Sequence, residues 1–306
     1  MNVIEVEGLV KRYRRLRRPT TLAVDGLDLS VPTGGVFGFL GPNGAGKTTT
    51  IRCLLGLVRP SAGSCRLLGA DSGAELAGVA GRIGSIVEAP AFFPGMSGRK
   101  NLALLGRLEG LGRGDVTTAL ERVGLGDRGK DRVKTYSLGM KQRLGIAAAL
   151  LKDPEVLILD EPANGLDPAG IKEVRELLRS LGKEGRTVFV SSHILSEVRQ
   201  MCDHVAILAR GRCVATGSVD EVLHRGSGRL VIGIDEPGAA AQVLRSRGIS
   251  VEVDGDRVVV DSPVADPKDI TRALAEKGLF LNELHREEAD LESVFLELTA
   301  DREASG

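Results

Sequence analysis

The sequence predicts an α/β protein in which helices cover both faces of a parallel β-sheet, followed by a small α+β domain. Apolar runs of strand length lie at residues 36–40, within 155–162 and within 186–193. These runs are continuous rather than alternating, which indicates strands buried on both faces of a parallel sheet. Helical patterns such as residues 171–181 separate them. The length of 306 residues exceeds one average domain and favours two folding units.

The order of these patterns predicts where the two domains lie. We expect the first at residues 1–222, with a mainly helical subdomain at about 90–153, and a linker at 222–228. The second, at residues 229–306, shows a strand, a helix, two strands joined by an Asp-Gly-Asp turn, a helix and a strand. This order predicts a ferredoxin-like α+β domain with one added helix at residues 291–298, in a structural or interfacial role.

Composition excludes several classes of protein. Forty-one basic residues balance 41 acidic ones, so no nucleic acid partner is expected. The four cysteines form no CxxC pair, which fits unpaired thiols in a reducing compartment. The N-terminus is acidic where a signal peptide is basic, and no run reaches about 18 apolar residues. We therefore expect a cytoplasmic protein that works at a membrane only through a partner.

A glycine-rich segment, GPNGAGKT at residues 41–48, stands between the first predicted strand and a helix that starts at about Lys47. Its glycines allow backbone N–H groups to converge on phosphate oxygens, Lys47 reaches the terminal phosphates, and the Thr48 hydroxyl is available to Mg²⁺. A turn without function is the alternative, but the strand and helix supply the context that the motif requires. The predicted nucleotide contacts here are Gly41, Pro42, Asn43, Gly44, Ala45, Gly46, Lys47, Thr48 and Thr49.

Two adjacent acids, Asp160 and Glu161, end the second predicted strand. The first carboxylate is placed to hold the Mg²⁺ shell together with Thr48, and the second to orient or deprotonate the water that attacks the γ-phosphate. A helix N-cap or a solvated turn would explain such a pair in isolation. Because ligands of parallel sheets bind at the carboxyl ends of the strands, the position favours a functional pair.

Between these two sites lies YSLGMKQR at residues 136–143, and with it the chain resembles the ATP-binding cassette (ABC) ATPases, whose signature is LSGGQ followed by a basic residue and QR. The resemblance covers about residues 1–222. It implies a P-loop NTPase fold, with a RecA-like core sheet and a helical signature subdomain. It also implies ATP and Mg²⁺ as cofactors, and a homodimer that closes around two nucleotides.

Three further positions carry the resemblance. The segment NGLD at residues 164–167, which ends in Asp167, looks like the loop that crosses the dimer interface of these ATPases. His193 looks like the histidine that contacts the γ-phosphate, and Tyr13 like the aromatic residue that stacks on adenine. With Lys47 and Glu161, His193 completes the catalytic residues that the sequence predicts.

The signature segment also has a physical interpretation of its own. Ser137 is suited to cap a helix at residues 138–151, which leaves free N–H groups and the positive end of the helix dipole for an anion. In the family that anion is the γ-phosphate bound to the opposite subunit, so Ser137 and Gly139 are predicted to contact nucleotide there. Leu138 and Met140 depart from the family pattern, where glycine and glutamine stand. Taken alone, the segment also fits an ordinary capped helix.

Glu88 is a second departure, because cassette ATPases usually have a glutamine there that touches Mg²⁺ and leads into the segment docked on the membrane partner. Glutamate at this position resembles the bacitracin and lantibiotic export ATPases, and the C-terminal LESVFLELT is similar to the tails of drug-export cassettes. A carboxylate can ligate Mg²⁺, so Glu88 is predicted as a metal ligand and nucleotide contact. A neutral substitution in a surface loop is the alternative.

Together these features predict the ATP-hydrolysing subunit of an exporter. It would lie on the inner face of the cell membrane, bound to a separate transmembrane permease, and power export of an antibiotic, a peptide or another drug-like compound. The alternative is a soluble single-cassette ATPase that acts as an assembly or regulatory module without a transport partner. The transported substrate cannot be inferred from this chain, because the cassette need not touch it.

Overall fold

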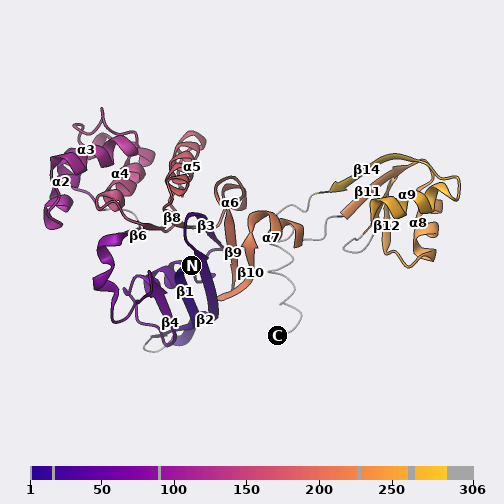
Figure 1. The fold of residues 1–306 in the computed structure, drawn as a ribbon, viewed down its shortest axis with the longest axis horizontal. Helices are drawn as coiled ribbons and strands as arrows, with labels where there is room; N and C mark the ends of the chain where they lie inside the picture. The colour runs from indigo at the N-terminus through magenta and orange to yellow at the C-terminus, as the bar shows by residue number, and fades with distance from the viewer. Residues whose placement is uncertain (1, 16–17, 89–90, 226–228, 261–265, 288–306) are drawn as a thin grey trace. The chain divides into compact units, whose positions relative to one another are not determined.

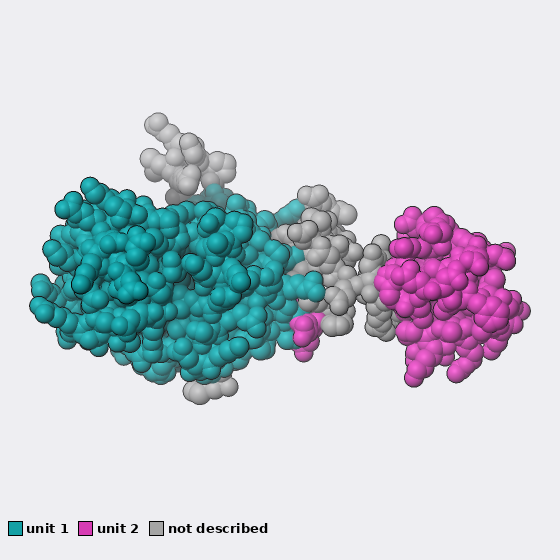
Figure 2. Space-filling model, turned by 90° about the horizontal axis from the view of Figure 1, so that it is seen from above, with its two compact units in different colours: residues 1–219 teal, residues 220–306 magenta. Residues whose placement is uncertain are grey.

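The computed structural model describes residues 2–15, 18–88, 91–225, 229–260 and 266–287. It divides the chain into two compact units, Met1–Val219 and Asp220–Gly306, coloured teal and magenta in Figure 2. No helix in these described ranges combines the length and the apolar character needed to cross a bilayer.

A six-stranded sheet forms the centre of the first unit, with strand order β10-β9-β3-β8-β7-β6. Its strands are β3 (Gly35–Leu40), β6 (Ile83–Ile86), β7 (Val156–Leu159), β8 (Thr187–Ser192), β9 (His204–Ala209) and β10 (Arg212–Ser218). The strands from β9 to β6 are parallel, and β10 is antiparallel at the edge. Every residue of β7 and β8 is buried, as their continuous apolar sequences predict.

Helices pack against this sheet (Figure 1). One group contains α2 (Gly98–Leu108), α3 (Arg113–Arg122) and α4 (Leu138–Leu150), which contact one another and make the region at about 90–153 mainly helical, as predicted. The remaining helices are α1 (Lys47–Leu54), α5 (Pro168–Lys183) and α6 (Leu195–Met201). Single 3₁₀ turns occur at Leu76–Gly78, Ala80–Arg82 and Val133–Thr135.

An antiparallel sheet at the N-terminus was not anticipated from the sequence. It has the order β2-β1-β4-β5, formed by β1 (Asn2–Arg15), β2 (Arg18–Pro32), β4 (Ala62–Leu67) and β5 (Ala70–Asp71). Several register shifts interrupt the pairing of β1 with β2, and bulges of this kind break the strict alternation by which a strand is recognised in a sequence. One hydrophobic core joins this sheet, α1 and the central sheet, so the N-terminal strands support the loop that precedes α1.

The second unit has the predicted strand-helix-strand-strand-helix-strand order. Its elements are β11 (Arg229–Ile234), α8 (Pro237–Ser246), β12 (Val251–Asp254), β13 (Arg257–Val260), α9 (Pro267–Ala275) and β14 (Leu281–Glu287). All neighbours in the sheet β12-β13-β11-β14 are antiparallel, and apolar residues of both helices pack on it in a separate core.

The linker at 222–228 stays a prediction, and one further expectation lies outside the described residues. The predicted linker at 222–228 is in part helical, because α7 (Val219–Arg225) extends into it; the two acids in its first turn favour a helix start. The added helix predicted at residues 291–298 falls outside the ranges that the structure describes.

Candidate functional site

The register of the central sheet brings three loops of the chain together. Leu40 at the end of β3 pairs with Ser192 at the end of β8, and Leu159 at the end of β7 pairs with Val190. The loop that follows β3, the acids that follow β7 and the histidine that follows β8 therefore emerge at one edge of the sheet. This is the edge at which parallel α/β sheets bind ligands.

The loop between β3 and α1 has a backbone that requires glycine at two positions. Gly46 has φ +107°, and a Cβ atom there would lie 2.5 Å from the carbonyl oxygen of Ala23. At Gly41 a Cβ atom would lie 2.7 Å from the carbonyl oxygen of Leu208. Because α1 begins at Lys47, directly after Gly46, the unpaired N–H groups of its first turn adjoin the loop, as in anion-binding helix starts.

Lys47 is almost completely buried, with 5% of its surface exposed. Its ammonium group donates to the carbonyl oxygens of Gly41 at 2.6 Å and Pro42 at 3.3 Å. It also forms an ion pair with Glu161 Oε1 at 3.1 Å. Lys47 thus links the glycine-rich loop to the acid that follows β7.

Thr48 and Asp160, which the sequence predicts as metal ligands, are hydrogen-bonded to each other. The hydroxyl of Thr48 donates to Asp160 Oδ2 at 2.7 Å, and the hydroxyl of Ser191 donates to Asp160 Oδ1. Hydroxyl and carboxylate oxygens are hard ligands of the kind that Mg²⁺ prefers, so this donor set fits the ion.

Glu161 lies between a lysine and a histidine. Its Oε1 pairs with Lys47, and its Oε2 lies 2.6 Å from His193 Nδ1. Its backbone has φ +49°, an uncommon conformation for a residue other than glycine, which costs of order 1 kcal/mol. A hydrogen bond from the Glu161 N–H to Ser191 Oγ, at 3.0 Å, helps to hold this backbone.

The other predicted site residues lie on different elements. Ser137 caps α4 as expected, because its Oγ accepts from the Met140 N–H at 3.2 Å; Gly139 is in the first turn of that helix. Asp167 caps α5 and accepts from the Gly170 N–H at 3.1 Å. Tyr13 is on β1, and the ammonium of Lys11 lies 5.1 Å from the centre of its ring.

Glu88 is directed to a partner that the sequence analysis did not consider. Its carboxylate forms an ion pair with Arg52 on α1, rather than a contact with Thr48 or Asp160. Glu88 has φ +73° and an exposed side chain. Its role as a metal ligand stays a prediction, and it would require the carboxylate to leave Arg52.

Sequence reasoning also missed two residues at the site. Ser191 contacts both acids of the pair, and Glu197 on α6 accepts a hydrogen bond from Ser192, the neighbour of His193. The available signal for Ser191 was a polar residue at the end of an otherwise apolar strand. For Glu197 it was an acid one helical turn after His193, which is a weak signal without the fold.

The sequence matches the family model described as ABC transporter over residues 24–164. It is 40% identical over 302 residues to the bacitracin transport ATP-binding protein of Bacillus licheniformis, a match that covers 97% of each chain. The chain belongs to the ABC transporter family. It is an ATP-hydrolysing subunit, and as the cassette fold implies it binds adenine nucleotide.

Other proteins that are similar to this cassette support the same family assignment. A daunorubicin resistance ATP-binding protein of Streptomyces coeruleorubidus is 41% identical over 310 residues, covering 97% of this chain and 96% of that one. Among solved structures, a component of an ABC transporter complex from Clostridium perfringens gives a TM-score of 0.64 at 28% identity, covering 80% of this chain and 95% of that one. A dimeric ATP-binding cassette with ADP and phosphate gives 0.63 at 20% identity, covering 71% and 98%, and supports the fold.

Proposed function

We propose that this cassette powers the export of an antibiotic, a peptide or another drug-like compound through a separate membrane permease. The observation that carries the ATPase part is the cluster of Lys47, Glu161 and His193 beside the Thr48 and Asp160 pair. The export part is supported by the relatives named for bacitracin transport and daunorubicin resistance, which match nearly the full chain. The chain would lie on the inner face of the membrane, bound to that permease.

The residues of the site have distinct roles in this proposal. Lys47 and the N–H groups of the loop bind the β- and γ-phosphates. The side chain of Lys47 is buried, and this position directs its ammonium group into the loop. Thr48 and Asp160 hold Mg²⁺, which neutralises phosphate charge when it is bound. Glu161 accepts a proton from the attacking water or orients it, and His193 contacts the γ-phosphate while it holds the second oxygen of Glu161.

Two copies of the chain complete each site in this proposal. The first turn of α4, with Ser137 at its N-cap and Gly139 after it, offers N–H groups and a helix dipole to the γ-phosphate bound by the other copy. The half-exposed Leu138 gives this helix start an apolar side chain where the family pattern has glycine. Tyr13 stacks on adenine with the ring face that Lys11 leaves open.

Apolar side chains exposed on the helical region favour a partner that covers them. Phe93 and Leu108 are 61% and 83% exposed, and Met96, Leu104 and Leu105 are also exposed. The buried Asn101 of α2 holds the backbone of Phe93 through its carbonyl oxygen and its amide. Fixed apolar groups on a surface typically mark an interface, so we assign these side chains to the permease contact.

Substitution of this surface tests the export role. Phe93→Ser with Leu108→Ser should abolish resistance and efflux in cells that also produce the partner permease, while the purified chain keeps its ATPase rate. Leu57→Ser is a matched control, since Leu57 is 64% exposed and lies elsewhere, and should keep both activities. Full resistance in the double variant would contradict the assigned contact. A wild-type chain that neither binds a membrane protein nor alters resistance would favour the soluble assembly or regulatory module.

A further inference from the structure

A carboxylate outside the predicted site lies directly behind His193. Glu197 is in the first turn of α6, and its Oε2 accepts a hydrogen bond from the Ser192 hydroxyl at 3.2 Å. The same hydroxyl accepts from the Ile194 N–H at 3.0 Å. Ser192 and Ile194 flank His193 in the sequence, so the hydroxyl that Glu197 holds fixes the turn on which His193 stands.

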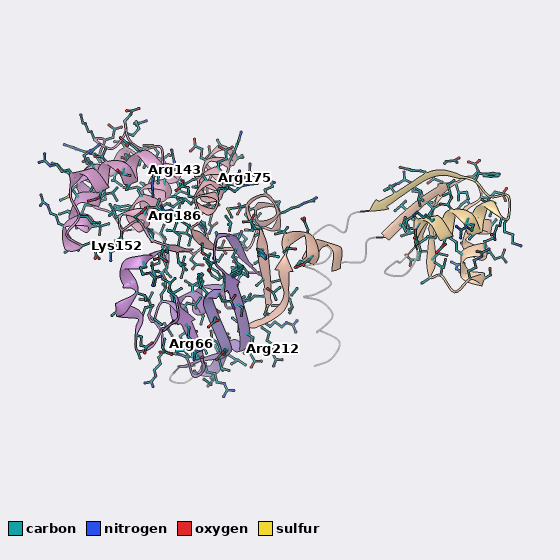
Figure 3. The ribbon with its side chains drawn as sticks, viewed as in Figure 1. Arg66, Arg143, Lys152, Arg175, Arg186 and Arg212 are labelled. Carbon is teal, nitrogen blue, oxygen red and sulfur yellow. The ribbon has the colours of Figure 1, made fainter. Side chains whose placement is uncertain are left out.

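The second oxygen of Glu197 is in an unusual environment. Within the described part of the chain, Oε1 is buried and has no hydrogen-bond partner. Glu197 lines a small cavity together with Glu161, Ser191 and Arg175 of α5, the last of which is labelled in Figure 3. The space open to the centre of a water-sized sphere is about 10 Å³, about the minimum for one ordered water molecule.

Three charged side chains, those of Glu161, His193 and Arg175, influence the pKa of Glu197. Burial raises the pKa of Glu197, and the negative charge of Glu161 raises it further; the hydrogen bond from Ser192 and the charges of His193 and Arg175 act in the opposite direction. The net result is a pKa above the ordinary value of a glutamate. A water molecule in the cavity can donate one hydrogen to the free oxygen of Glu197 and the other to the carboxylate of Glu161.

We propose that Glu197 is a positioning residue for ATP hydrolysis, which holds the Ser192 hydroxyl with one oxygen and, through one water molecule, supports the Glu161 carboxylate with the other. The inference rests on the proposed roles of Glu161 and His193. Glu197 does not touch nucleotide in this scheme. It fixes the relative position of the acid and the histidine, and positioning of this kind acts on turnover rather than on nucleotide affinity.

The test compares four variants of the full-length chain by steady-state ATPase rate, binding of a fluorescent ATP analogue and thermal unfolding. Glu197→Gln keeps the shape and an oxygen that accepts from the Ser192 hydroxyl, so it should keep at least about half of the wild-type turnover number. Glu197→Ala and Glu197→Asp lose the reach to Ser192 and should lower turnover about tenfold, the scale of one lost hydrogen bond, with nucleotide affinity unchanged. Glu176→Ala, an exposed acid on α5, is the matched control and should leave the rate unchanged.

A double-mutant cycle separates positioning from general stability. If Glu197 acts through Ser192, the Ser192→Ala and Glu197→Ala effects should not add, and the double variant should be about as slow as Glu197→Ala alone. Additive losses would overturn the inference, as would a Glu197→Ala rate within twofold of wild type or a Glu197→Gln variant as slow as Glu197→Ala. Should Glu197→Ala not fold, the contrast between Gln and Asp decides. A wild-type chain that binds ATP without hydrolysing it would instead overturn the proposed function.

Discussion

Lys47 holds its ammonium group against two carbonyl oxygens and one carboxylate, in a position with 5% exposure. Replacing it with alanine removes the only side-chain charge that the loop itself supplies to the terminal phosphates. ATP turnover in Lys47→Ala should fall by at least about two orders of magnitude, the scale of one lost preorganised electrostatic contact. A coupled ATPase assay measures this, with Lys172→Ala on the exposed face of α5 as the control. Wild-type hydrolysis in Lys47→Ala would contradict the phosphate-loop assignment.

The ion pair between Glu88 and Arg52 offers a second test at single residues. If Glu88 ligates Mg²⁺, Arg52 competes with the metal for its carboxylate. Arg52→Ala should then lower the Mg²⁺ concentration that gives half-maximal ATPase rate, and Glu88→Ala should raise it. Both shifts should be about two- to fivefold, because exposed ion pairs contribute up to about 1 kcal/mol. Mg²⁺ titrations that leave both variants at the wild-type value would identify Glu88 as an exposed loop acid.

Sequence motifs located the residues that share one loop or one strand end, but not those that meet across the sheet. Lys47, Thr48, Asp160 and Glu161 follow from spacing and residue type, and in the structure Lys47 pairs with Glu161 and Thr48 with Asp160. Ser191 is joined to Asp160 only by the pairing of β7 with β8. A contact of this kind depends on strand order, which spacing along the chain does not reveal.

At the scale of elements, the buried cysteines make the stability of the fold depend on pH. Cys65 lies on β4, and burial together with the neighbouring Cys53 and Asp71 raises its pKa to about 12. A raised pKa in the folded state means that its contribution to stability is complete below the unfolded value of about 8.5 and is lost as the pH rises toward 12. Cys65→Ala should therefore lose less stability than wild type between pH 8 and pH 10.5.

Urea unfolding at the two pH values measures this difference, and Cys213→Ala on the edge strand β10 is the control. Burial raises the pKa of Cys213 as well, but its side chain is only partly buried, so its substitution should change the pH dependence less. If wild type and Cys65→Ala lose equal stability between the two pH values, the Cys65 thiol does not contribute to this loss.

Elements differed in how well the sequence predicted them, and the reason is periodicity. The strands of the central sheet are continuous apolar runs, and α5 has an apolar face that packs on β3 and β8. Both kinds of element could therefore be predicted from the sequence. The pairing of β1 with β2 could not be predicted, because its register shifts remove the alternation of apolar and polar residues. The part of α7 at residues 222–225 was predicted as linker because a linker and a short polar helix have similar compositions.

At the scale of the whole molecule, a nucleotide-dependent dimer is the central prediction. Glu161→Gln should bind ATP without hydrolysing it, so light scattering should show a dimer with ATP and largely a monomer with ADP. Ser137→Arg in the same background places a long side chain at the start of α4 and should prevent the ATP-dependent dimer. To exclude self-association through the second unit, the measurement is repeated without residues 229–306. If the mass of that shortened chain does not change with nucleotide, the result would count against a dimer that closes around two nucleotides.

The order of strands in the central sheet also has a consequence for biosynthesis. β3 ends at Leu40, yet both of its neighbours, β8 and β9, begin at Thr187 or later. Roughly 150 residues must therefore be translated before β3 can pair, which takes roughly 7–30 s at about 5–20 residues per second. During that interval the nascent chain carries an apolar strand with two unsatisfied edges, so ribosome-associated chaperones have a defined segment to protect. The nucleotide site, assembled from the same strands, becomes competent only near the end of synthesis of the first unit.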